Sequence, residues 1–396
     1  MCALGSWLVV PGCLLVLAQA SRSQQVWPVT NDQEFQAALQ AAAPGDVVQL
    51  VPAAVFLDFV LTKGLTVRGP GTIGGVPAGS GVRTVTVPAG QLAQFVDVTF
   101  ALNPYPAAGQ ASLRVTGGAV RFERCTILGA AVGPALAVTS AQVLVQDCQI
   151  QAGNGVVGLR AVDAHLCLRD TLVSGSIAMT GVDGARGLEC SGSGSLHVSA
   201  AQIRGGNGLA THGGVQLQAP AIGLQSSVPT WLADATLEGG SITGPNPGAA
   251  ALSVTGAAAW HAHCAFVGGA GTPPGASIVG LAYAEPTLLG ATSSAPLQRG
   301  QSTTLRLLAD QSGVPVGLLV MTGLRAPILH PLPWQPLWLG EVLLVVPGAT
   351  GGDGAFPLIL SVPDDPLLSN QSVHLLGFRL GGGGVQLAPL LGGLVR

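Results

Sequence analysis

The chain has 396 residues, of which only 9% are charged, and its formal net charge is −3. This length leaves room for two domains, and the excess of 19 acidic over 16 basic side chains excludes the basic surface that binds nucleic acid. The 58 glycines and 28 prolines argue against long helices, and after the first 20 residues no apolar run approaches the ~18 residues that a membrane-spanning helix needs.

Residues 1–20 have the features of a secretory signal peptide. The apolar stretch Leu8–Leu17 is followed by Ala18–Ala20, a small-residue cleavage site. The segment before the apolar stretch lacks the usual Lys or Arg. We therefore expect an exported protein that is secreted or held at the cell surface.

A short helix is expected near the start of residues 26–50. Asn31 or Thr30 can cap its N-terminus, and Pro44-Gly45 ends it. The segment Asp46–Leu50 is typical of a first strand. Such an amphipathic helix would cover the exposed end of a repetitive β-structure, which otherwise invites aggregation.

A six-residue pattern then recurs along the middle of the chain, with small or apolar residues at its first, fourth and sixth places. The first two steps between copies are 23 residues long, measured from Cys125 to Cys148 to Thr171. A short unit repeated at such a spacing, with variable insertions, is typical of a solenoid. The copies are Phe122–Ile127, Val145–Ile150, Leu168–Val173, Val198–Ile203, Leu232–Leu237 and His261–Phe266.

A second series precedes the first and alternates apolar with variable residues, the period of a strand with one buried face. Glycine and small polar residues separate the two series, so each repeat holds at least two strands with room for a third. The sequence thus predicts an all-β fold, a right-handed parallel β-helix over residues 26–282. The second series consists of Leu113–Val115, Leu136–Val138, Leu159–Ala161, Leu188–Cys190, Val215–Leu217 and Leu252–Val254.

The opening of this region resembles the pectin-lyase-like right-handed β-helix proteins. The likeness rests on Glu34–Asp46, a helix ending in a Pro-Gly-Asp turn, and on Phe59–Gly69, which contains a Lys-Gly-Leu-Thr rung. It extends over roughly residues 30–280 as a likeness of fold. Because many functions share this scaffold, the resemblance implies the architecture and leaves the chemistry open.

Residues 283–396 depart from the repeat. Prolines punctuate short apolar runs such as Thr303–Leu308, Val316–Val320 and Glu341–Val346. This pattern predicts a small antiparallel β-sandwich as a second, C-terminal domain.

One outward position per repeat carries mostly charged side chains, and stacking of the turns would place them in one column. One hypothesis is a site for a cation, with calcium as the ion considered, or for a sugar chain laid along the solenoid. The alternative is that Asp stands there because it suits a tight turn. The candidate residues are Asp97, Arg124, Asp147, Asp170, Asp234 and His263.

Two further pairs of residues occupy equivalent places on successive repeats. Trp231 and Trp260 could be exposed platforms on which sugars stack, or they could cover the core. Cys125 and Cys148 would lie one strand spacing apart, which is compatible either with a disulfide or with buried free thiols.

The motifs expected of an enzyme on this scaffold are absent from the solenoid. It lacks the clustered carboxylates of glycosidases, and no motif points to a basic residue that would serve a lyase. The segment from Leu368 to Gly377 resembles the ending of C-terminal β-modules on exported bacterial surface proteins. We therefore predict an exported, non-catalytic bacterial protein that binds a glycan or a cell-surface partner, or serves as structure there. The alternative is a polysaccharide lyase or glycoside hydrolase, and no cofactor beyond the calcium considered above is expected.

Overall fold

The computed structural model describes most of the chain from Gln24 onward. The described ranges are 24–52, 55–56, 58–74, 83–101, 110–129, 133–154, 156–178, 183–209, 218–243, 246–284, 290–293, 298, 300–308, 312–322, 328–329, 336–337, 341–364, 372–381, 384–387 and 391–394. The predicted signal peptide and the predicted strand Val215–Leu217 lie outside the described residues. No helix in these ranges is long and apolar enough to cross a membrane.

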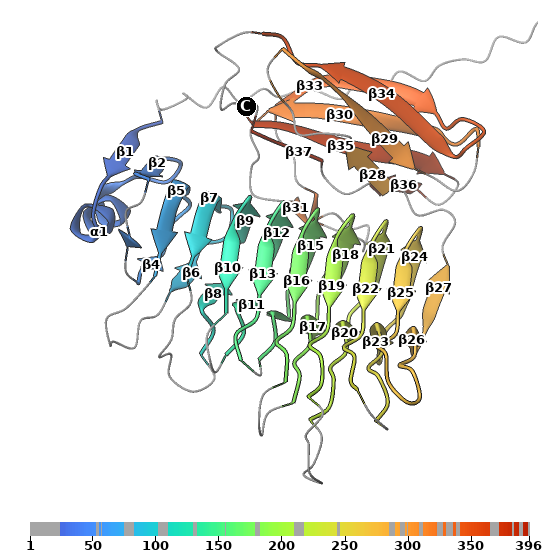
Figure 1. Cartoon of the computed structure of the whole chain (residues 1–396). Helices are drawn as coiled ribbons and strands as arrows, with labels where there is room; N and C mark the ends of the chain where they lie inside the picture. Colours follow the sequence, from blue (N-terminus) through green and yellow to red (C-terminus); the bar gives the residue numbers. More distant parts are fainter. Residues whose placement is uncertain are drawn as a thin grey trace, which may run out of the picture.

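The chain winds into a parallel β-helix, as predicted, and each turn holds three short strands where the sequence indicated at least two (Figure 1). The first-row strands form one parallel sheet of nine strands. They are β4 (Val60–Leu61), β6 (Thr84–Thr86), β8 (Leu113–Thr116), β11 (Leu136–Thr139), β14 (Leu159–Val162), β17 (Leu188–Ser191), β20 (Leu224–Ser226), β23 (Leu252–Val254) and β26 (Ile278–Val279).

The second and third strands of each turn form the other long sheet. The second row is β1 (Val26–Val29), β2 (Val47–Leu50), β5 (Thr66–Ile73), β7 (Leu92–Phe100), β9 (Ala119–Glu123), β12 (Gln142–Gln146), β15 (His165–Arg169), β18 (Ser195–Ser199), β21 (Thr230–Ala233), β24 (Ala259–Ala262) and β27 (Ala282–Ala284). The third row is β3 (Val55–Phe56), β10 (Thr126–Leu128), β13 (Gln149–Gln151), β16 (Leu172–Ser174), β19 (Gln202–Arg204), β22 (Thr236–Glu238) and β25 (Ala265–Val267), and β5 and β7 are long enough to continue into it.

Successive turns stack residue on residue. Val145 pairs with Leu168 in the second row, and Ile150 pairs with Val173 in the third. The apolar positions of the predicted repeat point inward and form one continuous core along the solenoid. In the early turns this core is aromatic, with the rings of Phe95 and Phe122 stacked 5.3 Å apart. The period of the sequence therefore sets the register, because each inward side chain covers its equivalent on the next turn.

Helix α1 (Asp32–Ala41) caps the N-terminal end, as predicted. Asn31 accepts a hydrogen bond from the backbone N–H of Glu34 at 3.0 Å, and the Glu34 carboxylate accepts one from the N–H of Thr30 at 2.7 Å. This reciprocal arrangement satisfies the free N–H groups of the first turn. Phe35 then packs its ring 5.1 Å from that of Phe56, so the helix covers the first turn of the core.

One predicted strand was wrong. The place assigned to Val215–Leu217 is taken by β20, where Leu224 pairs with Leu188 and Leu252. In the early turns the first-row strand leads the second-row position by nine residues, as from Leu136 to Val145. The segment at 215 starts 17 residues before Leu232, whereas Leu224 starts eight before it. The insertion therefore lies ahead of the first-row strand, and the spacing rule could have located it.

The C-terminal part is built from antiparallel sheets, as predicted. One sheet holds β28 (Gly290–Ser293), β29 (Ser302–Leu308) and β34 (Ala355–Ser361). The other holds β33 (Glu341–Ala349), β30 (Pro315–Thr322), β35 (Ser372–Gly381), β36 (Gly384–Leu387) and β37 (Leu391–Leu394), and β31 (Ile328–Leu329) pairs with β32 (Pro336–Leu337). Leu305 and Leu307 from the first sheet share one core with Leu318 and Leu375 from the second, which makes the two sheets a sandwich.

The sandwich lies against the outside of the solenoid (Figure 1). Met321 of β30 and Leu376 of β35 pack with Leu144 and Cys167, which belong to β12 and β15. Because alternate residues of a strand point to opposite faces, Leu144 and Cys167 point away from the solenoid core. The outer face of the second-row sheet is thus partly an interface within the chain.

Candidate functional site

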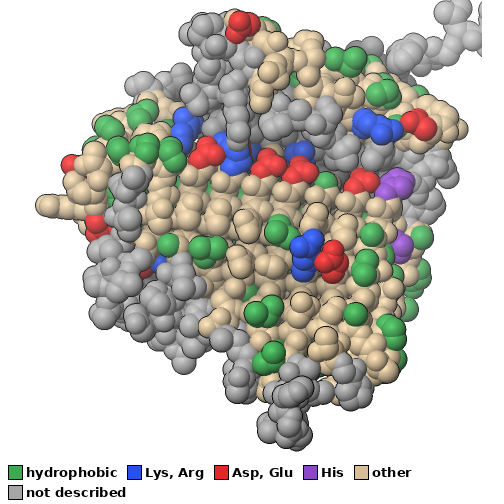
Figure 2. Space-filling model, viewed as in Figure 1, with side chains coloured by type: hydrophobic (Ala, Val, Ile, Leu, Met, Phe, Trp, Pro, Cys, Tyr) green, Lys and Arg blue, Asp and Glu red, His purple; other side chains and the backbone are tan. Residues whose placement is uncertain are grey.

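The predicted column exists as one row along the corner between the second-row and third-row strands, here called the corner row. All its members have left-handed backbones, with φ between 45° and 57°. Asp tolerates this conformation better than most residues, which explains its frequency there. The row consists of Asp97, Arg124, Asp147, Asp170, Ala200, Asp234 and His263, and Figure 2 shows charged side chains along a line beside the C-terminal sheets. The structure therefore places all six predicted site residues in one row, each on a different turn of the solenoid.

The N-terminal part of the corner row is an ion-pair cluster. Arg124 contacts both carboxylate oxygens of Asp97, at 2.7 and 2.8 Å, and also contacts Glu123. Glu123 in turn lies 2.7 Å from Arg121, and the side chains of Arg121 and Glu123 are each only 1% exposed. Burial alone would lower the pKa of Arg124, but Asp97 and Glu123 outweigh it and raise that pKa. Arg124 therefore stays protonated and is unsuited to accept a proton.

The middle of the corner row holds two carboxylates on adjacent turns. Desolvation by the surrounding chain and the charge of Asp170 raise the pKa of Asp147, while Arg169 and Arg124 act in the opposite direction. Asp170 lies 2.9 Å from the guanidinium of Arg169. The described residues contain no group of three or more His, Cys, Asp or Glu side chains that could hold a metal ion. Calcium prefers six to eight oxygen ligands, and here it would meet two carboxylates, one of which already contacts Arg169.

The last part of the corner row is a histidine–carboxylate pair. The His263 Nδ1 atom lies 3.6 Å from an Asp234 oxygen. His263 is about half exposed, and Asp147 and Asp170 in the middle of the row are exposed as well.

The corner row has a parallel neighbour on the third-row strands, here called the polar row. Its outward residues are uncharged, and Gln149 and Gln202 are exposed. Register pairs each member with its equivalent on the next turn. Both rows therefore repeat with the strand spacing of about 4.8 Å and together form one long, mostly polar surface, in which Leu172 and Ala200 are the apolar members. The polar row consists of Thr126, Gln149, Leu172, Gln202 and Thr236.

The two predicted tryptophans stack on each other. The rings of Trp231 and Trp260 lie 5.1 Å apart and nearly parallel, and His197 stacks on the other face of Trp231 at 4.6 Å. Their register continues that of Leu144 and Cys167, so the rings lie on the outer face of the second-row sheet and do not cover the solenoid core. With both faces covered and 6% exposure, Trp231 offers no ring face to a sugar.

His197 was not singled out from the sequence, although a signal was present. It stands three residues before Ala200 in the corner row, the same offset that joins Trp231 to Asp234. Burial lowers the pKa of His197 to about 3. The imidazole is therefore neutral at physiological pH and acts as a packing group.

The disulfide considered for Cys125 and Cys148 is not formed, and both are buried free thiols. The Cys148 thiol donates a hydrogen bond to the carbonyl of Gln146 at 3.0 Å, and the Cys125 thiol donates to the carbonyl of Phe95 at 3.3 Å. On the next turn the Thr171 hydroxyl bonds the carbonyl of Arg169 in the same way as Cys148 does. Each of these side chains thus donates to a backbone carbonyl, and the Cys148 sulfur also accepts a hydrogen bond from the backbone N–H of Cys125 at 3.2 Å.

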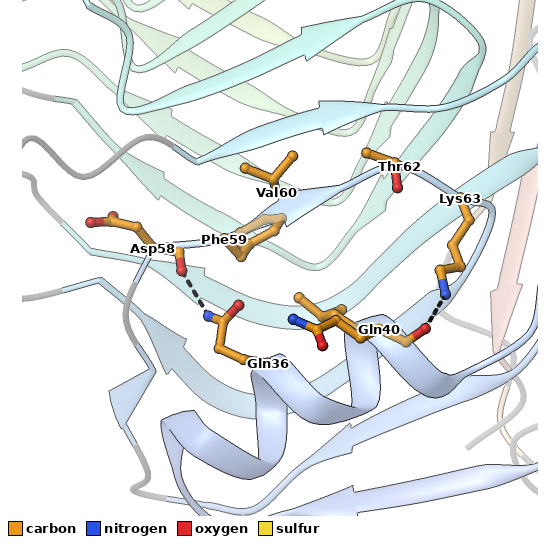
Figure 3. Close-up of a pocket in the computed structure, with 8 residues that line it drawn as sticks. Gln36, Gln40, Asp58, Phe59, Val60, Thr62 and Lys63 are labelled. Atoms are coloured by element: carbon orange, nitrogen blue, oxygen red, sulfur yellow. Dashed lines mark hydrogen bonds between the residues drawn. The ribbon is translucent and has the colours of Figure 1, made fainter.

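A hollow of about 550 Å³ lies beside helix α1 (Figure 3). The Lys63 ammonium donates to the carbonyls of Gln40 and Ala42 at 2.7 and 2.8 Å, and the Gln36 amide donates to the carbonyl of Asp58 at 2.8 Å. A cation bonded to the last carbonyls of a helix stabilises its C-terminus. The polar groups of the hollow thus hold the cap in place.

Replacing Asp147 by Asn tests the electrostatics of the corner row. Asn keeps the left-handed backbone and removes the repulsion with Asp170, so we expect the free energy of unfolding at pH 7 to stay unchanged or rise by up to about 1 kcal/mol. The matched variant Asp97→Asn weakens the pairing with Arg124, so its free energy of unfolding should fall by about 1 kcal/mol. Urea denaturation checks both, and a clear loss of stability in Asp147→Asn would contradict the assignment.

Comparisons with known proteins add little to this site. No protein-family model matches the sequence, and no curated protein matches it. Among solved structures, the chain is similar to an alginate lyase from Paenibacillus sp. str. FPU-7, with 14% identity, 66% of this chain and 99% of that chain covered, and a TM-score of 0.30. The β-helix assignment therefore rests on the strand register described above.

Proposed function

We propose that this protein is an exported, non-catalytic module that binds a polysaccharide along the outside of its β-helix. The observation that carries the proposal is the pairing of the corner row with the polar row, which gives one long surface with a period of about 4.8 Å. An extended sugar chain also repeats its hydroxyl groups at regular intervals along its length. A surface that offers an amide, a hydroxyl or a carboxylate from at least one of the two rows on each turn from Asp97 to Asp234 can bond such a chain at successive points.

The charged groups of the surface favour binding over catalysis. A general base must be able to lose its proton near neutral pH and must reach the substrate. Arg124 is held protonated by Asp97 and Glu123, and Arg121 and Arg169 are each no more than 3% exposed. These groups hold the corner in shape, while the exposed amides Gln149 and Gln202 remain available for hydrogen bonds to a ligand.

One observation favours the enzyme alternative. The pKa of Asp147 is raised, and Asp147 is exposed beside a second carboxylate, Asp170. Glycoside hydrolysis uses two neighbouring carboxyl groups, one of which has a raised pKa and acts as the general acid. A polysaccharide lyase or hydrolase acting at this pair is therefore the second candidate.

The test is a panel of acidic and neutral polysaccharides, with binding to the full chain measured by calorimetry. We expect retention of at least one polysaccharide without release of unsaturated products or new reducing ends. The double variant Gln149→Ala and Gln202→Ala should weaken that binding by about tenfold, because each lost hydrogen bond contributes about 0.5–1.5 kcal/mol.

The matched control is Gln225→Ala, on the first-row strand β20, which should leave binding unchanged. Product release at catalytic rates that is lost in Asp147→Asn would establish the enzyme alternative. Failure of every polysaccharide to bind would overturn both candidates.

A further inference from the structure

The last turn of the solenoid is an open end. Each of its strands pairs with one neighbour within the described part of the chain: β25 with β22, β26 with β23, and β27 with β24. The other edge of each strand therefore carries backbone N–H and C=O groups that can pair with another chain. Figure 1 shows β27 at the end of the row of stacked strands.

Large apolar side chains gather at this end. Val267, Val279, Leu281 and Tyr283 are 53%, 47%, 59% and 50% exposed, although all four belong to or adjoin the last three solenoid strands. These side chains lie on different outer faces of the last turn, since Val267 continues the row of Glu238, Val279 that of Ser253 and Tyr283 that of Trp260. They form an apolar rim around the open end, and exposed apolar side chains beside open strand edges are typical of a protein–protein contact.

The described strands of this end carry no formal charge, and the first charged residue after them, Glu285, lies outside the described residues. From Gly239 to Ala284 the sequence contains no Asp, Glu, Lys or Arg, and His261 and His263 are its only titratable side chains apart from Cys264 and Tyr283. Exposed strand edges are commonly protected from pairing by charged side chains, Lys above all, or by Pro. Strands β25, β26 and β27 have neither, and Glu285 and Pro286, which follow β27, lie outside the described residues.

The opposite end of the solenoid is protected in each of these ways. Helix α1 covers the first turn, and its first turn carries Asp32 and Glu34. The edge strand β1 contains Pro28, which lacks an N–H group for pairing. Head-to-tail growth of one solenoid on another is therefore disfavoured.

We propose that two copies of this chain associate end to end through their last turns, related by a twofold axis. An uncharged end can meet a second uncharged end without burying an unpaired charge or bringing like charges together. The end of a second copy has the same cross-section and also presents three open strand edges. Strands β25, β26 and β27 can therefore all find partners at once. A single peptide strand would pair with only one of them. The protected N-terminal ends point outward, and the assembly closes as a dimer.

The test is the mass of the full chain in solution, by light scattering and sedimentation velocity over a range of micromolar concentrations. We expect twice the 39.5 kDa of one chain. Leu281→Lys places a charge in the contact on both copies and should raise the dissociation constant on the order of 100-fold or more. The matched control is Ile177→Lys, since Ile177 is 65% exposed in the middle of the solenoid, and it should remain dimeric.

Val267→Lys, on β25, keeps the test decisive if Leu281→Lys fails to fold. A monomeric wild-type protein at every concentration would overturn the proposal. A dimer that persists in folded Leu281→Lys and Val267→Lys, or one that is lost equally in Ile177→Lys, would also overturn it, because the contact would then lie elsewhere. Higher assemblies that grow with concentration would contradict the closed, twofold arrangement.

Discussion

Replacing Glu123 by Gln will lower the free energy of unfolding by about 3–5 kcal/mol, the cost typical of leaving a buried charge without its partner. The Glu123 carboxylate lies 2.7 Å from Arg121, and it also contacts Arg124. The side chains of Glu123 and Arg121 are each 1% exposed, so water cannot take the place of the lost carboxylate. Gln has nearly the same shape as Glu, so the loss of stability measures the effect of removing the negative charge at position 123.

The matched control is Glu238→Gln. Glu238 lies 3.0 Å from Arg204 on the exposed third-row strands, where both side chains are more than a third exposed. Such surface pairs contribute about 0–1 kcal/mol, so this variant should unfold almost as the wild type does. Urea denaturation measures the free energy of unfolding of both variants, and comparison of the denaturant slopes checks that the unfolding transition is the same. Equal, small losses in the two variants would mean that the Glu123 pair is reached by water and that the sandwich does not cover this face.

A second large effect is expected from acid. The pKa of His197 is about 3 in the folded protein because the imidazole is buried, whereas the ordinary value is 6.5. Below pH 6.5 the unfolded chain therefore binds a proton at this residue that the folded chain does not bind. The contribution of His197 to stability is complete above pH 6.5 and falls by about 1.4 kcal/mol per pH unit as the pH drops toward 3.

The measurement compares wild type with His197→Gln between pH 8 and pH 4. At pH 8 the variant should be the less stable protein, because it loses the ring stacked at 4.6 Å on Trp231. The difference should shrink and then reverse as the pH falls, because only the wild type must keep an imidazole uncharged. A difference that stays constant across this range would show that His197 is reached by water and titrates normally.

The repeat allowed most of the solenoid to be predicted, because one inward side chain per strand recurs at a nearly constant spacing. The recurring Asp97, Asp147 and Asp170 also indicated a tight turn at the corner. The left-handed backbone found there explains why Asp recurs, since Asp tolerates that conformation. The spacing failed only where an insertion shifted the first-row strand to Leu224. The N-terminal helix could be predicted because Asn31 and Glu34 form a local capping motif that needs no tertiary contact.

The surroundings of the site could not be predicted in the same way. Met321 and Leu376 meet Leu144 and Cys167 across a long stretch of sequence, and no local pattern links them. The burial of the Arg121–Glu123 pair on the same outer face was hidden for the same reason, since a charged residue on an outward position ordinarily faces water. The repeat fixes which side chains share a row, and tertiary contacts decide whether that row meets solvent.

The most direct test of the stacked coil is a cross-link between equivalent places on adjacent turns. Gln151 pairs with Ser174 in the third row, where neighbouring strands lie about 4.8 Å apart, within the roughly 4.4–6.8 Å between Cα atoms that a disulfide spans. Oxidation of the double variant Gln151→Cys and Ser174→Cys should yield the intramolecular bridge, identified by mass spectrometry of peptides. Gln151→Cys with Glu238→Cys, three turns apart, should stay reduced. Bridging of both pairs equally, or of the distant pair alone, would contradict the parallel β-helix.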